Sequence, residues 1–167
     1  MKPATYYKTL LLSLMLISMS ACDKKQKDVQ QNDIAKNKNE ELFKSTLTTH
    51  LDAVTNRNLT VLKSTMSPKG DMELIQPGAE IVYAVDGFIN FHQDWFAVPN
   101  WTFKTKVLST NIGNKIGVAT TEILYEEPER NGKPYFNRMI VSYTLEKING
   151  NWYIIKDHAS SMEKSTN

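Results

Sequence analysis

Apolar residues recur every three to four positions over residues 41–57, at Phe43, Leu47, Leu51 and Val54. This spacing places them on one face of an amphipathic helix. The same pattern is weaker over residues 23–40, where apolar side chains are almost absent. We therefore expect the packed part of the chain to begin near residue 41.

The segments that follow are short, and turn residues separate them. A second helix is expected over residues 59–66, before Ser67-Pro68-Lys69-Gly70, and strands are expected over residues 72–76 and 80–85. A third helix is expected over residues 87–97, with Asp86 as its N-cap.

From Trp101 onward, the period changes from that of a helix to two. Apolar and polar side chains alternate over four segments, at residues 101–108, 116–126, 135–147 and 151–160. The pairs Asn131-Gly132 and Asn149-Gly150 are typical of tight hairpin turns. Helices followed by an antiparallel meander predict an α+β domain.

The first 21 residues have the pattern of a secretory signal peptide. Lys2 and Lys8 precede an apolar run of about ten residues, which is too short for the roughly 20 that cross a bilayer. The small residues before Cys22 resemble the bacterial lipoprotein signal, which implies cleavage at this cysteine and its acylation. An ordinary signal beside an unmodified cysteine is the alternative.

The cysteine usage agrees with an acylated Cys22. It is the only cysteine of the chain, so the folded part has no thiol for a disulfide. More than one acyl chain would make a firm anchor in the lipid bilayer. Asp23 resembles the signal for retention at the periplasmic face of the inner membrane, and the outer membrane stays open as an alternative.

Charge and composition divide the chain further. Removing residues 1–21 takes away two lysines, so the balance changes from 20 basic and 18 acidic residues to 18 and 18. A near-neutral protein lacks the electrostatic footprint of nucleic-acid binding. Residues 22–40 are expected to be a disordered tether, residues 41–161 the domain and residues 162–167 a tail.

Four stretches carry a resemblance to a known superfamily. They are AVTNRNLTVLKSTMSP, PGAEIVYAVDG, DWF and NGNWYIIKDHASS. With the order of elements, they resemble the SnoaL-like domains of the nuclear transport factor 2-like superfamily, and the last also resembles the association domain of calcium/calmodulin-dependent kinase. The resemblance implies a cone-shaped fold: three N-terminal helices packed on a strongly bent antiparallel sheet, with a pocket at the wide end. It also implies pairing into a homodimer through the outer face of the sheet in many members.

The stretch WYIIKDHASS, residues 152–161, contains the residue types of a hydrolase triad. In a regular strand neighbouring side chains point to opposite faces. Asp157 is therefore expected on the same face as Tyr153 and Ile155, and His158 on the same face as Trp152. Asp157 and His158 therefore cannot both face one pocket without a bulge. This geometry argues against Ser-His-Asp hydrolysis.

Ten residues are candidates for the lining of a pocket. They comprise two histidines on helices, several aromatic residues and the polar end of the last strand. The ten are His50, Tyr83, Phe91, His92, Trp95, Trp101, Tyr125, Tyr143, Asp157 and His158. Each is also compatible with a purely structural core position. The histidines have no metal-ligand spacing, and neither a metal nor a cofactor is expected.

Three functions stay open at this point. The first is a membrane-anchored domain that binds a small, apolar ligand or a partner without catalysis. The second is an isomerase, dehydratase or cyclase in which Asp157 or a histidine of the pocket is the base. The third is a structural lipoprotein that acts through dimerisation. Fold alone does not choose among them.

Overall fold

The computed structural model describes residues 6–166, and it describes side chains from residue 30 onward. The first five residues of the predicted signal and the side chain of Cys22 lie outside the described residues. Backbone contacts divide the chain into two units, Met1–Asn39 and Glu40–Asn167. Helix α1 (Tyr6–Thr55) runs through both units.

The predicted tether is helical in the structure, as part of α1. The reason is visible in the sequence: no glycine or proline occurs between Ala4 and Ser67, and lysine, glutamine and glutamate are favourable helix residues. Low apolar content prevents burial, but it does not prevent a helix. Within residues 6–166, no helix has both the length and the apolar composition needed to cross a bilayer.

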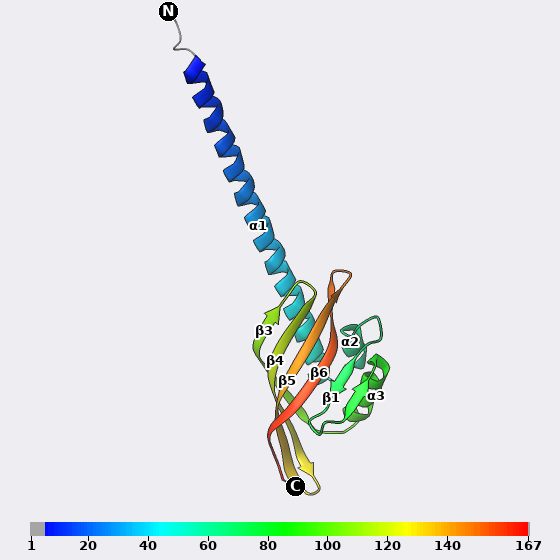
Figure 1. The fold of residues 1–167 in the computed structure, drawn as a ribbon. Coiled ribbons are helices and arrows are strands. Elements are labelled where there is room, and N and C mark those ends of the chain that lie inside the picture. The colour runs from blue at the N-terminus through cyan, green and yellow to red at the C-terminus, as the bar shows by residue number, and fades with distance from the viewer. Residues whose placement is uncertain (1–5, 167) are drawn as a thin grey trace, which may run out of the picture. The chain divides into compact units, whose positions relative to one another are not determined.

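The sheet of the second unit has six strands in the order β2-β1-β6-β5-β4-β3 (Figure 1). Their bounds are β1 (Glu73–Ile75), β2 (Ile81–Tyr83), β3 (Thr102–Ile112), β4 (Ile116–Arg130), β5 (Lys133–Ile148) and β6 (Asn151–Lys164). The four long strands form the predicted meander. The prediction of a purely antiparallel sheet is wrong, because β1 pairs parallel with β6. The sheet is mixed, and the class is α+β.

The core lies between the inner face of this curled sheet and the helices. The part of α1 after residue 40 contributes Phe43, which is completely buried and meets the ring of Trp152 edge-on at 5.2 Å. Phe43 also lies against Gly117 of β4, where a Cβ atom would come within 2.5 Å of its ring. Helices α2 (Leu59–Ser64) and α3 (Val85–Phe96) lie on the same side as the short strands (Figure 1).

The third helix begins earlier than predicted, and Asp86 is not its N-cap. The cap position is Ala84, with a φ of +65° and no side-chain hydrogen bond. The backbone N–H of Ala84 donates to the carbonyl of Met72 at 2.8 Å, which fixes the entry to the helix without a capping side chain. Asp86 instead lies in the first turn and forms an exposed ion pair with Lys63.

A β-bulge interrupts the pairing of β5 with β6. Thr144 pairs with Lys156 and Leu145 pairs with Ile154, so Ile155 has no partner in the ladder. One extra residue on one strand reverses the face of every residue beyond it. This irregularity decides which side chains of β6 reach the interior.

Candidate functional site

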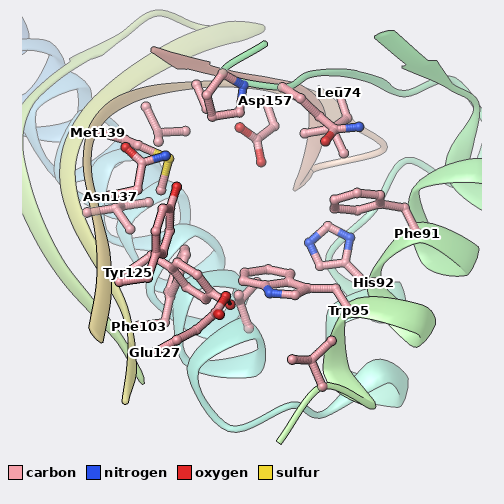
Figure 2. Close-up of a pocket in the computed structure, with 18 of the residues that line it drawn as sticks. Leu74, Phe91, His92, Trp95, Phe103, Tyr125, Glu127, Asn137, Met139 and Asp157 are labelled. Atoms are coloured by element: carbon pink, nitrogen blue, oxygen red, sulfur yellow. Dashed lines mark hydrogen bonds between the residues drawn. The ribbon is translucent and has the colours of Figure 1, made fainter. Parts of the chain in front are cut away.

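A cavity of about 310 Å³ lies between α3 and the inner face of the sheet (Figure 2). This volume is at the lower end of the roughly 300–1,000 Å³ of typical small-molecule pockets. Most of its lining is apolar or aromatic, and a few polar groups lie among these residues. The residues that line it are Val54, Leu74, Gln76, Pro77, Phe91, His92, Trp95, Val98, Phe103, Ile123, Tyr125, Glu127, Arg130, Tyr135, Asn137, Met139, Val141, Tyr143, Asp157 and Ala159.

Strand β5 forms one continuous wall of the cavity. Alternate residues face inward along it, in the order Tyr135, Asn137, Met139, Val141 and Tyr143. At one end Tyr143 lies opposite Asp157 of β6, and at the other Asn137 lies opposite Tyr125 of β4. The cavity therefore has a polar group at each end and an apolar middle.

Asp157 is the principal polar group at the first end. Its side chain is only 8% exposed, and Oδ1 has no hydrogen-bond partner among the described residues. Burial raises the pKa of this carboxyl to about 7, because desolvation disfavours the charged form. Figure 2 shows the carboxyl pointing into the cavity, beside Leu74 of the parallel strand β1.

The bulge at Ile155 explains the orientation of Asp157. In a regular strand Asp157 would lie on the same face as Ile155. The extra residue places it instead on the same face as Trp152 and Ile154. His158 points to the opposite side and is exposed. The two residues therefore face opposite ways, as the alternation predicts, and Asp157 is the one that lines the cavity.

Tyr143 lies directly across from this carboxyl. It is almost completely buried, and its pKa is raised well above the usual value by burial and, to a smaller extent, by the nearby charge of Asp157. Its phenol is therefore protonated at neutral pH. It supplies a hydroxyl group, and no charge, to this end of the cavity.

The opposite wall comes from α3 and is aromatic. The ring of His92 packs between Phe91 and Trp95, and its Nδ1 donates to the carbonyl of Phe88 at 2.8 Å. Burial lowers the pKa of His92 to about 4, so the ring is neutral at pH 7. Because a carbonyl can only accept, the proton of the neutral ring is on Nδ1 and Nε2 is the basic nitrogen.

Trp95 lines the cavity, while Trp101 supports it from behind. Their rings stack at 4.7 Å with an angle of 13°, and Nε1 of Trp101 donates to the carbonyl of Trp95 at 3.2 Å. Arg57 covers the ring of Trp101, with its guanidinium carbon 3.7 Å from the ring centre. Trp101 thus packs behind the aromatic wall and supports it, but it does not line the cavity.

A closed polar cluster lies at the second end of the cavity. Arg130 donates from Nε to Oε2 of Glu127 at 2.9 Å and from Nη2 to Oε1, and Tyr125 donates to the same Oε1 at 2.5 Å. The guanidinium of Arg130 also lies 3.5 Å above the ring of Tyr135. The hydrogen bonds from Arg130 hold the pKa of Glu127 below its usual value, so the two side chains neutralise each other.

Two other candidates lie away from the cavity. His50 is buried in the core, where its Nδ1 bonds to Oγ1 of Thr65 at 2.8 Å. Burial, with a smaller effect from His92, lowers the pKa of His50 to about 3. Tyr83 is on strand β2 and is 65% exposed. Neither residue lines the cavity.

Several lining residues were not among the sequence candidates. Asn137 is the most informative of them, because it is 8% exposed and its Oδ1 has no partner among the described residues. Alternation along the strand that contains Met139 and Tyr143 extends to Asn137 and could have identified it. Glu127 and Arg130 are close to a hairpin turn, beyond the strand end predicted at residue 126, and alternation gave no signal for them.

Within the part of the chain that the structure describes, no three histidine, cysteine, aspartate or glutamate side chains gather to hold a metal ion. The polar groups of the cavity can take part in hydrogen bonding, proton transfer and ion pairing. Asp157 and Asn137 are the two lining residues with a buried, unpartnered oxygen among the described residues.

Comparison with known proteins places the fold in a family. Residues 44–164 match the family model described as a SnoaL-like domain. No curated protein matches the chain.

Solved structures share the fold at low sequence identity. The hexachlorocyclohexane dehydrochlorinase LinA-type3 from Novosphingobium barchaimii is 13% identical, with a TM-score of 0.69, and the match covers 80% of this chain and 92% of that one. A ketosteroid isomerase-like protein from Erwinia carotovora atroseptica is 12% identical with a TM-score of 0.63, covering 74% and 95%. A nuclear transport factor 2-like protein of unknown function from Pseudomonas putida is 12% identical with a TM-score of 0.62, covering 75% and 87%.

Proposed function

The chain belongs to the SnoaL-like domain family, and we propose that its second unit binds a small, largely apolar molecule in the cavity between α3 and the sheet. The observation that carries this proposal is the carboxyl of Asp157, which is buried at the cavity wall and has one oxygen without a hydrogen-bond partner among the described residues.

Burying a polar group without a partner destabilises the folded protein by about 1–3 kcal/mol, and more when the group is charged. Native proteins therefore pair such groups, and the exceptions call for an explanation. Asp157 faces a cavity whose middle is formed by Met139, Val141 and Ile123. A ligand that fills this apolar space and carries one hydrogen-bonding group would pair the carboxyl.

Native mass spectrometry of the purified full chain tests the proposal. We expect a small molecule to copurify with the protein and to be lost in Ala159→Phe, which places a ring in the cavity opposite Val141. The matched control is Val118→Phe, which adds the same ring type on the exposed face of β4. Equal ligand content in both variants, or none in the wild-type chain, would contradict the proposal.

A second function, acid–base catalysis by Asp157, is favoured by one specific observation. A pKa of about 7 is close to the working pH of most enzymes, where a carboxyl can both accept and return a proton. Two structures of the same fold are named as a ketosteroid isomerase-like protein and a dehydrochlorinase. The reaction would be proton abstraction next to an electron-withdrawing group.

Proton exchange distinguishes this second function from binding alone. If Asp157 is a base, a ketosteroid incubated with the full chain in heavy water should take up deuterium next to its carbonyl, as measured by mass spectrometry. Asp157→Asn should abolish the exchange, whereas Glu163→Gln, at an exposed position of the same strand, should not. Exchange that persists in Asp157→Asn would exclude this carboxyl as the base.

We further propose that Cys22 anchors the protein to the bacterial cell envelope. The pattern of residues 1–22 supports this, with Asp23 favouring the periplasmic face of the inner membrane. Acylation would hold the binding domain at the membrane surface, where apolar molecules concentrate.

A further inference from the structure

We propose that the ligand of this cavity is a lipophilic amine, whose protonated nitrogen pairs with Asp157 while its hydrocarbon body fills the apolar middle of the cavity. This inference rests on the proposed binding function and adds the chemical class of the ligand.

The charges that line the cavity do not balance. Three lining residues carry a formal charge: Glu127, Arg130 and Asp157. Glu127 and Arg130 are joined by two hydrogen bonds and neutralise each other. Among the described lining residues, Asp157 is therefore the ionisable group without an opposite charge beside it.

The residues around Asp157 do not supply the missing cation. His92 is held neutral by burial, and its Nδ1 donates to a helix carbonyl. Lys156, the preceding residue, points away from the cavity and pairs with Glu73 of β1 at 3.1 Å. Tyr143 offers only a neutral phenol. None of the described residues that line the cavity supplies a positive charge to this carboxyl, so in the proposed complex the ligand supplies it.

The surroundings of the carboxyl suit a cation better than an anion. Phe91 and Trp95 line the opposite wall, and the faces of aromatic rings attract ammonium groups. A ligand carboxylate in the same space would face Asp157, with the nearest lining guanidinium already paired to Glu127. Desolvated charges of equal sign repel strongly at short range.

The apolar middle sets the shape of the ligand. Between the two polar ends the wall is formed by Met139, Val141, Ile123 and Ala159. A cavity of about 310 Å³ accepts a chain or a single ring with a short arm. At the far end, the amide oxygen of Asn137 has no partner within the described part of the chain and could accept from a second, weaker polar group of the same ligand.

Three molecules that differ only in their polar group test the inference: phenylpropylamine, phenylpropanol and phenylpropanoic acid. Binding of each to the full chain is measured by titration calorimetry at about pH 8, where Asp157 is largely ionised and an aliphatic amine, with a pKa of ~10, is protonated. We expect the amine to bind about tenfold or more tightly than the alcohol, because its positive charge adds an attraction to the carboxylate that a neutral hydroxyl donor lacks. The acid should bind most weakly.

Variants show whether Asp157 causes the preference. Asp157→Asn should reduce the affinity for the amine to that for the alcohol, and Glu163→Gln should leave the preference unchanged. Equal affinities for amine and alcohol in the wild-type chain would overturn the inference but leave the binding function standing. Failure of all three probes to bind would overturn both, and a preference that persists in Asp157→Asn would exclude this carboxyl as the partner of the amine.

Discussion

Asp157 makes the stability of the folded protein depend on pH. Its folded-state pKa of about 7 lies above the ordinary value of 3.8, so between these pH values the folded protein holds a proton that the unfolded chain releases. The stability that this proton contributes is fully present below about pH 4 and is lost as the pH rises through about 7.

Replacing Asp157 by asparagine should therefore change the pH dependence of stability. The free energy of unfolding of Asp157→Asn minus that of the wild-type chain should increase between about pH 4 and pH 7 and then level off. The total increase is up to about 4 kcal/mol for a shift of this size. Urea unfolding of both proteins at a series of pH values measures it, and a difference that does not vary with pH would contradict the pKa argument.

The buried histidines act in the opposite direction. The folded pKa values of His50 and His92, about 3 and about 4, lie below the ordinary value of 6.5. Their contribution to stability is present above about pH 6.5 and is lost as the pH falls, because the unfolded chain takes up protons that the core excludes.

Removing one histidine should reduce this acid sensitivity. The test uses Asp157→Asn as the background, because the proton of Asp157 has the opposite effect on the pH dependence. In this background, His92→Gln should reduce the increase of the unfolding free energy with pH between pH 4 and pH 6. The reduction corresponds to about one bound proton, or roughly 1.4 kcal/mol per pH unit. The same urea series measures the slope. An unchanged slope would mean that His92 is not buried in its neutral form.

At the level of elements, alternation predicts the long strands well. The inward face of β5 agrees with the sequence pattern, since Met139, Val141, Tyr143 and Leu145 are all buried. The neighbour of β1 was not predictable, because three residues carry no periodicity that distinguishes a parallel partner from an antiparallel one. The face of Asp157 was not predictable either, because a bulge depends on pairing with strands that are distant in sequence.

The contact between α1 and β4 gives a prediction for Gly117. A Cβ atom at this position would lie 2.5 Å from the buried ring of Phe43. Gly117→Ala should therefore destabilise the protein by about 1–3 kcal/mol through overpacking. Gly78→Ala is the matched control, since its Cβ atom would meet nothing within 4 Å. Urea unfolding compares the two, and equal stability would show that Phe43 moves aside freely.

At the level of the whole molecule, the order of elements predicts the α+β class, whereas the helix over residues 22–40 was not predicted. Low apolar content indicated disorder there, but the segment is helical in the structure because it contains good helix residues and no helix breaker. Composition reports whether a segment can be buried. It does not report whether the backbone of that segment forms a helix.

Membrane attachment through Cys22 is tested in cells that express the full chain. Cys22→Ala should move the protein from the membrane fraction to the soluble fraction, because without the thiol no acyl chain can be added. Ser20→Ala keeps a small residue before the cysteine and should stay in the membrane fraction. If Cys22→Ala also remains with the membrane, the lipid anchor is excluded.

The bulge at Ile155 also determines how strand β6 responds to changes in length. Loss of the codon for Ile155 would remove the unpaired residue, and Asp157 would keep its inward position. Loss of the codon for Lys156 would have the same effect on Asp157, because Ile155 would then take the ladder position opposite Thr144. Two deletions at adjacent codons thus have the same outcome for the cavity, because either one makes the strand regular and leaves the carboxyl facing inward.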